Sequence, residues 1–318
     1  MHILIANNTT IPALKYGGTE RVIWWLGKEL SRRGHKVTYL VSAGSSCPFA
    51  NTLVFDPSIP FDDQIPDDVD VVHSNFRVLQ EMKKPFIVTM HGYNDDGTIF
   101  DLNTVFVSKR HAEIHRSSTF VHNGLDPEEY GRFDHDMPRS HLLFLAAIRR
   151  SAKNLKGAIV IAKKAGQDLA IVGGWGLSFN RHIRYYGLLG GEAKNAVIRR
   201  SSALIFPVLW DEPFGLALIE AMYHGCPVIG TPYGALPEII TKDTGVLSTS
   251  LDELVDAAAD HSQFNRQRIH EHVMANFTSV QMTNNYLALY ERVISGEAIN
   301  QSVPHRIPES FSMHYPIQ

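Results

Sequence analysis

Two carboxylates with a fixed spacing are the residues of this chain best suited to chemistry. Glu212 and Glu220 stand eight positions apart in a stretch that reads as a helix followed by the strand-like run Pro227 to Gly230. If the helix opens at Trp210, a rise of about 1.5 Å per residue places the two carboxylates about 12 Å apart along one element. One could bind a hexose and the other a ribose, so the spacing fits a nucleotide-sugar.

The start of the same helix is expected to bind an anion. Pro213 suits a first helical turn. The backbone N–H groups of the next three residues, Phe214, Gly215 and Leu216, would have no acceptor within the helix. Partial positive charge collects at such an end, and a glycine lets a ligand approach the backbone closely. The sequence therefore predicts a diphosphate at the helix start, whereas packing on a sheet alone gives no reason for acids at both positions.

The two glutamates lie in a motif with matching flanks. A Glu, seven residues and a second Glu stand between the Phe-Pro that ends a strand and the Gly-x-x-x-Glu of residues 234–238. The stretch from Ala203 to Glu238 resembles the donor-binding segment of retaining glycosyltransferases of the GT-B fold, family 4 (group 1). The resemblance implies that Glu212 binds hydroxyls of the donor hexose and that Glu220 binds the ribose. It also implies a front-face mechanism, in which the departing phosphate oxygen takes the acceptor proton.

Loops that follow strands are the places to search for partners of this motif, because open sheets bind ligands beyond the carboxyl ends of their strands. After the first strand, Gly17 and Gly18 permit close backbone approach. The resemblance implies that this loop faces the diphosphate and the acceptor, although a plain helix entry would look the same. At the end of the fourth strand, His91 matches a family histidine that contacts the donor hexose. A structural, hydrogen-bonded histidine is the alternative there.

A basic loop follows the first strand of the second half. The family has Gly-Arg here and a Lys five residues after that Arg, and the two cations hold the pyrophosphate. This chain departs from the pattern, because Ala146 and Ala147 occupy the Gly-Arg position. We therefore assign the catalytic cation to Lys153, with Arg149 beside it. The sequence leaves open which basic residue binds the diphosphate among Arg149, Arg150, Lys153 and Lys156.

No cofactor and no metal site are expected. Gly173 follows a strand and is predicted to lie near the nucleotide, but its loop lacks the G-x-G-x-x-G spacing of an NAD enzyme. His111 and His115 stand four apart on a short helix without the adjoining Glu of a zinc protease, so solvated histidines are expected. The resemblance likewise implies no Asp-x-Asp metal site.

Alternation of apolar runs with helical patterns predicts parallel sheets covered by helices. Strands of the first half are expected at His2–Ala6, Lys36–Ser42, Val69–His73, Phe86–Met90, Thr104–Ser108 and Phe120–His122. After Pro138 the pattern restarts. The predicted fold is α/β, with two doubly wound Rossmann-like domains facing across a cleft and a C-terminal helix that crosses back. The predicted segments are an acceptor-side domain (1–138), a donor-binding domain (139–278), a crossover helix (279–295) and a tail (296–318).

Composition narrows the class of protein. The chain has 318 residues, of which 44% are hydrophobic and 20% charged, and its net charge is −3. These values indicate a soluble globular protein and argue against a nucleic-acid partner. Two cysteines give no disulfide framework, and no apolar run is long enough to span a membrane, so a cytoplasmic protein is expected. Basic and aromatic residues of a helix at 19–33 could make weak peripheral membrane contact through the first domain.

The resemblance thus implies a retaining glycosyltransferase for polysaccharide or glycoconjugate biosynthesis. It would move a hexose-type sugar from a nucleotide diphosphate donor to an acceptor hydroxyl, without a metal ion. The acceptor could be a sugar, a lipid-linked molecule or a small molecule. Two alternatives remain open: another GT-B enzyme, such as a nucleotide-sugar epimerase or a phosphorylase, and a non-catalytic nucleotide-sugar-binding protein. The nucleotide, the sugar and the oligomeric state cannot be predicted from the sequence.

Overall fold

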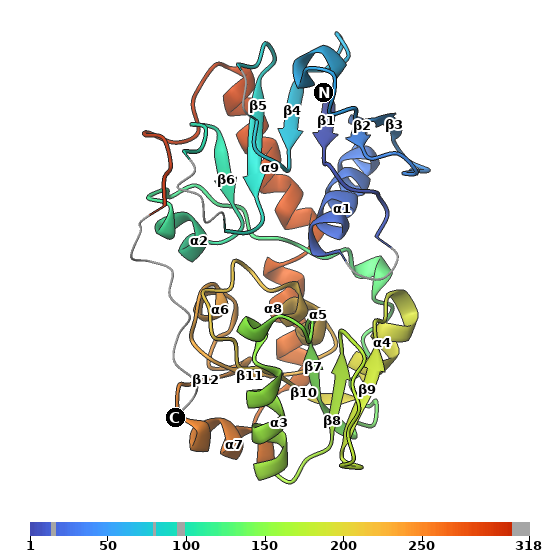
Figure 1. Cartoon of the computed structure of the whole chain (residues 1–318), viewed down its shortest axis with the longest axis vertical. Coiled ribbons are helices and arrows are strands. Elements are labelled where there is room, and N and C mark those ends of the chain that lie inside the picture. The colour runs from blue at the N-terminus through green and yellow to red at the C-terminus, as the bar shows by residue number, and fades with distance from the viewer. Residues whose placement is uncertain (14–16, 79–80, 94–98, 307–318) are drawn as a thin grey trace. The chain divides into compact units, whose positions relative to one another are not determined.

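The chain folds into two compact α/β units. The computed structural model describes residues 1–13, 17–78, 81–93 and 99–306. Unit 1 comprises Met1–Ala13, Gly17–Asp126 and the segment that starts at Thr278, and unit 2 comprises Pro127–Phe277 (Figure 1). Of the predicted tail 296–318, residues 307–318 lie outside the described residues.

Unit 1 is built on a six-stranded parallel sheet, counted within the described residues. The strand order is β3-β2-β1-β4-β5-β6, so the direction of winding reverses between β1 and β4. This order is typical of doubly wound dinucleotide-binding folds, which bind ligands at that point of reversal. The strands are β1 (His2–Ala6), β2 (Lys36–Val41), β3 (Asn51–Val54), β4 (Val71–Ser74), β5 (Phe86–Met90) and β6 (Thr104–Phe106).

The helices of unit 1 come from both ends of the chain. They are α1 (Gly18–Arg32), α2 (Lys109–Ile114) and α9 (Ser279–Ile294). The last helix packs against α1 and against β4 and β5, and Figure 1 shows it lying along the sheet. Buried polar groups join it to the strands, since Nδ1 of His73 lies 2.7 Å from the hydroxyl of Tyr290. Tyr290 stands 217 positions after His73, so a helix from late in the chain completes the core that the first strands begin.

Unit 2 repeats the same plan. Its six-stranded parallel sheet has the order β12-β11-β10-β7-β8-β9, and winding reverses between β7 and β10. The strands are β7 (His141–Leu145), β8 (Leu169–Val172), β9 (Ile183–Gly187), β10 (Ser201–Phe206), β11 (Val228–Gly230) and β12 (Gly245–Leu247). The helices are α3 (Leu155–Lys164), α4 (Gly191–Arg199), α5 (Leu216–Tyr223), α6 (Leu236–Ile239), α7 (Leu251–Ala259) and α8 (Arg266–Asn276).

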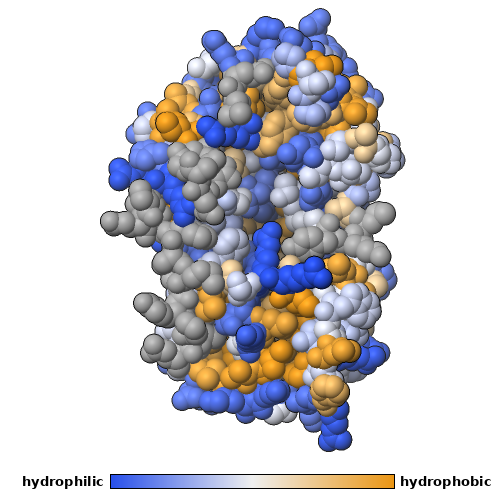
Figure 2. All heavy atoms as spheres, in the orientation of Figure 1, coloured by the Kyte–Doolittle hydropathy of each residue, from blue (hydrophilic) through white to orange (hydrophobic). Residues whose placement is uncertain are grey.

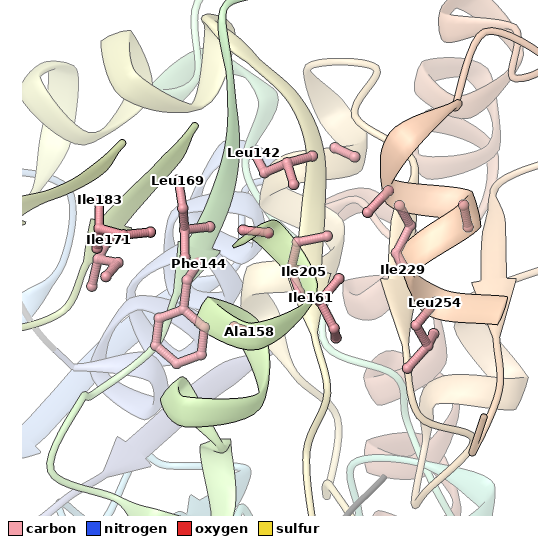
Figure 3. Close-up of a cluster of buried hydrophobic side chains, with 14 residues drawn as sticks. Leu142, Phe144, Ala158, Ile161, Leu169, Ile171, Ile183, Ile205, Ile229 and Leu254 are labelled. Atoms are coloured by element: carbon pink, nitrogen blue, oxygen red, sulfur yellow. The ribbon is translucent and has the colours of Figure 1, made fainter. Parts of the chain in front are cut away.

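The core of unit 2 lies between its sheet and the helices α3 and α7. Figure 3 shows Phe144 of β7, Ile161 of α3 and Leu254 of α7 in this cluster. All three side chains are fully buried. Each such side chain contributes about 1.5–3 kcal/mol of apolar burial, so the cluster holds the strand ends in place.

The prediction of two doubly wound α/β domains is confirmed, but several elements differ. Phe120 forms only an isolated bridge to Phe106, so the predicted strand Phe120–His122 is wrong. The strands β3, β9 and β12 were not predicted, because they are short or carry exposed polar residues. These three strands lie at the edges of the two six-stranded sheets. Hydrophobic periodicity therefore detected the inner strands and missed these edge strands.

The basic face of α1 is engaged with its own unit. Lys28 forms an ion pair with Asp126, and Arg32 and Arg33 both pair with Glu29. These contacts leave less charge for the weak membrane contact predicted through this helix. None of the described helices combines the length and the hydropathy that a bilayer crossing requires.

Exposed apolar side chains occur instead in the connection between β8 and β9. The exposed fractions are 77% for Trp175, 96% for Leu177 and 107% for Phe179. Figure 2 shows apolar side chains, in orange, gathered over part of the surface that unit 2 forms. Exposed apolar residues are common on globular proteins, so this exposure does not define a site by itself.

Candidate functional site

The candidate site of unit 2 lies where the strand order reverses, at the carboxyl ends of β7 and β10. After β7 the chain makes a 3-10 turn over Ser151–Lys153. Asn154 follows in the left-handed region, with φ of 54°, and its side chain joins two elements. Its Oδ1 accepts from the N–H of Gly157, and its Nδ2 donates to Pro207 O at 3.0 Å. The turn that carries Lys153 is therefore fastened to the loop after β10.

Lys153 and Glu212 form an ion pair in this site. Nζ of Lys153 lies 2.5 Å from Oε2 of Glu212, and the indole N–H of Trp210 donates to the same oxygen at 2.7 Å. The ammonium also lies 5.2 Å from the ring centre of Phe206. Both charged side chains are largely buried, with exposed fractions of 13% and 7%. The sequence predicted both residues as site residues but not their direct contact.

The backbone of Glu212 is held by the segment that follows β11. The N–H of Ala235 donates to Glu212 O at 2.9 Å, and the N–H of Gly234 donates to Oδ1 of Asp211 at 3.1 Å. Gly234 has a φ of 65°, and a Cβ atom there would lie 2.1 Å from Glu212 N. The Gly-x-x-x-Glu flank of the motif thus has a structural role, because only glycine allows this close approach.

Helix α5 begins at Leu216, not at Trp210, so the predicted geometry of the two glutamates is wrong. Glu212 lies in the loop before the helix, and Gly215 caps it with a φ of 88°. The loop exists because Gly215 adopts a left-handed conformation that a helix interior excludes. The predicted separation of about 12 Å along one helix therefore does not apply.

The three residues whose backbone N–H groups were predicted to face an anion differ in their exposure. Gly215 and Leu216 are half-buried, whereas Phe214 is 2% exposed and packs its ring against Phe277. Leu218 N–H is already bonded to Gly215 O. Since the first N–H groups of a helix have no acceptor within it, Leu216 is the predicted residue best placed to present an amide to an anion.

Glu220 is buried and bound by two groups of its own unit. Its exposed fraction is 3%. The hydroxyl of Tyr130 donates to Oε1 at 2.6 Å, and Nζ of Lys194 lies 2.5 Å from the same oxygen. Lys194 is equally buried and also lies 5.3 Å from the ring centre of Tyr130. The sequence reasoning missed both partners, which are 26 and 90 positions away from Glu220.

The other basic residues of the β7 loop differ from Lys153. Arg149, Arg150 and Lys156 are exposed. None of them forms an ion pair within the described residues, whereas Lys153 pairs with Glu212. Arg149 is thus accessible to a ligand without first leaving a carboxylate of the chain.

Gly173 has a packing reason to be glycine. Its φ is 132°, and a Cβ atom there would lie 1.9 Å from Ala146 O. Its N–H donates to Gly187 O, and its carbonyl accepts from Ile148 N–H at 3.2 Å. The glycine therefore lets the loops after β7, β8 and β9 meet at one edge of the sheet.

The candidate residues of unit 1 also stand at strand ends. Gly17, with a φ of 149°, caps α1, and Gly18 is the first residue of that helix and is exposed. His91 follows β5, and its Nε2 lies 2.8 Å from Oδ1 of Asn75, which follows β4. Burial lowers the pKa of His91 to about 4, so its ring is neutral at pH 7. Asn75 was missed, although its place directly after β4 could have revealed it.

His111 and His115 are buried, not solvated as predicted. Their rings pack with Phe106, and burial lowers the pKa of both. Among the described residues, no group of three or more His, Cys, Asp or Glu side chains could hold a metal ion.

The fold of the chain matches those of several solved proteins. The chain superposes on a glycosyltransferase involved in avilamycin A biosynthesis with a TM-score of 0.77 and 20% identity, over 93% of this chain and 98% of that one. It matches the HepE protein of Anabaena, solved with UDP and glucose, with a TM-score of 0.67 and 14% identity over 92% and 99% of the two chains. The fold is therefore that of the GT-B glycosyltransferases.

The family of one segment is shown by the sequence. Residues 130–263 match the family model described as glycosyl transferases group 1, so the chain carries a group 1 glycosyltransferase domain. It is 28% identical to N-acetyl-alpha-D-glucosaminyl L-malate synthase of Bacillus anthracis over 185 residues, which cover 52% of this chain and 48% of that protein. The alignments span about half or less of the length of the curated relatives. The predicted resemblance to group 1 glycosyltransferases of the GT-B fold is confirmed.

Proposed function

We propose that this protein is a retaining glycosyltransferase that moves a hexose-type sugar from a nucleotide diphosphate sugar to an acceptor hydroxyl. The observation that supports this proposal most is the buried pair of Lys153 and Glu212 at the strand-order reversal of unit 2. An ammonium and a carboxylate at one point can bind a phosphate oxygen and a sugar hydroxyl side by side.

Departure of the nucleoside diphosphate builds negative charge on the leaving oxygens. Fixed positive groups placed at that charge lower the barrier. Lys153 would supply one, Arg149 a second, and the amide of Leu216 a third. Glu212 would accept hydrogen bonds from hydroxyls of the hexose. For His91, the resemblance implies a contact with a donor hexose. With cations of the chain facing the diphosphate, we propose that transfer needs no metal ion.

Glu220 would bind the ribose. A carboxylate accepts about four hydrogen bonds. Tyr130 and Lys194 both bind Oε1, so they would orient the carboxylate toward the nucleoside. Because HepE of Anabaena was solved with UDP and glucose, UDP-glucose is the first donor to test.

The experiment is a donor panel followed by product analysis. UDP-, GDP-, ADP- and dTDP-sugars are screened for a rise in melting temperature, since a ligand of the folded state stabilises it. The stabilising donor is then incubated with sugar, lipid-linked and small-molecule acceptors, with and without a chelator. We expect transfer with an unchanged anomeric configuration, at a rate that the chelator does not alter. An inverted product, or a rate abolished by the chelator, contradicts the proposal.

A nucleotide-sugar-binding protein without turnover is the second candidate. Ala146 and Ala147, at the position where the family has Gly-Arg, favour it. Stabilisation by a donor with no transfer to any acceptor would support this candidate over the first.

A further inference from the structure

Asn75 and His91 stand on neighbouring strand ends of unit 1 in a geometry that sets the hydrogen positions. The backbone N–H of Asn75 donates to Ala6 O at 2.9 Å, and its side-chain Nδ2 donates to the same oxygen at 3.2 Å. Ala6 is the last residue of β1. A carbonyl oxygen can only accept, so the amide atom that faces Ala6 must be the NH₂ group and not the oxygen.

The orientation of Asn75 determines the tautomer of His91. With Nδ2 turned to Ala6, Oδ1 of Asn75 faces Nε2 of His91 at 2.8 Å. This amide oxygen is also an acceptor only, so Nε2 must carry the hydrogen. In a neutral imidazole one nitrogen donates and the other accepts. The Nδ1 atom of His91 is then an acceptor.

No described residue occupies Nδ1 of His91 with a hydrogen bond or an ion pair. The ring stays neutral at pH 7, because burial lowers the pKa of His91 to about 4. The imidazoles of His73 and His111, which lie nearby, also have lowered pKa values through burial. Nδ1 of His91 would become a donor only if the His91 ring itself were protonated, so at pH 7 it stays an acceptor.

We propose that Asn75 is the positioning residue that holds His91 in the Nε2–H tautomer, so that Nδ1 accepts a hydrogen bond from a hydroxyl of the donor sugar. The inference rests on the proposed function for its ligand, but the tautomer itself does not. The carbonyl of Ala6 in β1 fixes the amide of Asn75, and that amide fixes the tautomer of His91 after β5.

The test is a nitrogen NMR spectrum of the full chain labelled with ¹⁵N-histidine. The His91 signals are assigned by their loss in His91→Gln. At pH 7 we expect a protonated, pyrrole-type Nε2 and an unprotonated, pyridine-type Nδ1. In Asn75→Leu, which removes the acceptor at similar volume, the two shifts should move toward each other. Asn103→Leu changes an asparagine at the amino ends of the strands, whose Oδ1 accepts from Ile299 N–H, and should leave the His91 shifts unchanged.

Catalysis gives the second readout. Loss of one neutral hydrogen bond should lower kcat/KM of Asn75→Leu about tenfold. Asn103→Leu with the same melting temperature should retain the wild-type value. Donor binding should move the Nδ1 shift of the wild type, and a deoxy donor that lacks the bonded hydroxyl should not move it.

The outcomes separate this inference from the proposed function. A protonated Nδ1 in the wild type, or unchanged ring shifts in Asn75→Leu, overturns the role of Asn75 and leaves sugar transfer unaffected. A chain that transfers no sugar from any donor overturns the proposed function, while the tautomer of His91 is still measured in the free protein.

Discussion

Nζ of Lys153 lies 2.5 Å from Oε2 of Glu212, across 59 positions of sequence and between the two strands where the winding of unit 2 reverses. A ligand that binds here meets a cation and an anion already paired. Both side chains are already largely buried in the free protein, so little bulk water has to be removed from them when the ligand arrives. The site is therefore organised before the donor binds.

The first prediction concerns the cations of the β7 loop. Replacing Lys153 by Met should lower kcat/KM by about 10²–10³, the range for one lost group that stabilises transition-state charge. Steady-state kinetics with the donor found in the panel measure this. Lys156→Met changes an exposed lysine of the same segment and should stay near the wild type. If Lys156→Met lowered kcat/KM as much as Lys153→Met, the assignment of the stabilising cation to Lys153 alone would be wrong.

The second prediction concerns the stability of the buried pair Lys194–Glu220. Lys194→Met should lower the free energy of unfolding by about 3–5 kcal/mol, because it leaves a buried carboxylate without its cation. Urea titration measures the loss, and the double variant Lys194→Met/Glu220→Leu should recover part of it.

Helix α4 offers a matched control for this pair. Arg199 pairs with Glu192, whose side chain is 73% exposed. Arg199 itself is only 19% exposed, but Arg199→Met leaves an exposed carboxylate behind, so it should cost less than Lys194→Met, which leaves a buried one. Equal losses in the two single variants would mean that Lys194 and Glu220 do not interact as a buried pair.

The third prediction tests the ribose assignment of Glu220. Titration calorimetry compares a nucleotide with its 2′-deoxy and 3′-deoxy forms. In the wild type, removal of the bonded hydroxyl should weaken binding about tenfold, since a hydrogen bond to a charged group is lost. In Glu220→Gln the same removal should have a much smaller effect. If the deoxy penalty is identical in both proteins, Glu220 does not bind the ribose.

The fourth prediction concerns the close approach at Gly173. Gly173→Ala should destabilise the protein by about 3 kcal/mol, because a methyl group would overlap Ala146 O. Gly166 also has a positive φ, of 66°, but has open space around it. Gly166→Ala should cost only about 1 kcal/mol of left-handed strain. Similar losses in the two variants would contradict the steric argument.

The fifth prediction is the pH dependence of stability. Burial lowers the pKa of His73 to about 3, whereas an unfolded histidine has a pKa of about 6.5. Between these values the unfolded chain binds a proton that the folded chain does not, so stability falls as pH decreases from about 6.5 toward 3.

Urea titrations at a series of pH values between 6.5 and 4.5 test this linkage. His73→Gln should reduce the slope of unfolding free energy against pH by up to about 1.4 kcal/mol per unit. Glutamine keeps a donor and an acceptor for Thr89 and Tyr290, which bond to His73 in the wild type. An unchanged slope would show that His73 is protonated in the folded protein.

Alternation of apolar runs and helices sufficed to predict two doubly wound domains. It failed at Trp210, where the apolar pattern continues through a loop that a left-handed Gly215 ends. It also failed at β9, whose Arg184 and two tyrosines hide an edge strand. Hydrophobic periodicity arises when one face of a helix or strand is buried. Edge strands and loops bury too little apolar surface to produce it.

For the candidate site, the sequence predicted which residue types stand after which strands, but it did not predict which side chains contact each other. Glu212 and Lys153 follow strands that neighbour each other, but their pairing depends on the order of strands in the sheet. Tyr130 and Lys194 carry no local signal, because their partner lies on another helix. Long-range partners of buried charges follow only from the fold.

Helix α9 makes unit 1 depend on a segment that follows unit 2 in the chain. Its buried Tyr286 and Tyr290 contact Thr89 of β5 and His73 of β4, two strands that precede unit 2 in the chain. The ribosome must therefore synthesise all of unit 2 before helix α9 can cover the sheet of unit 1. A stop codon placed just after Phe277 would leave the second half of the molecule intact and damage the half that was made first.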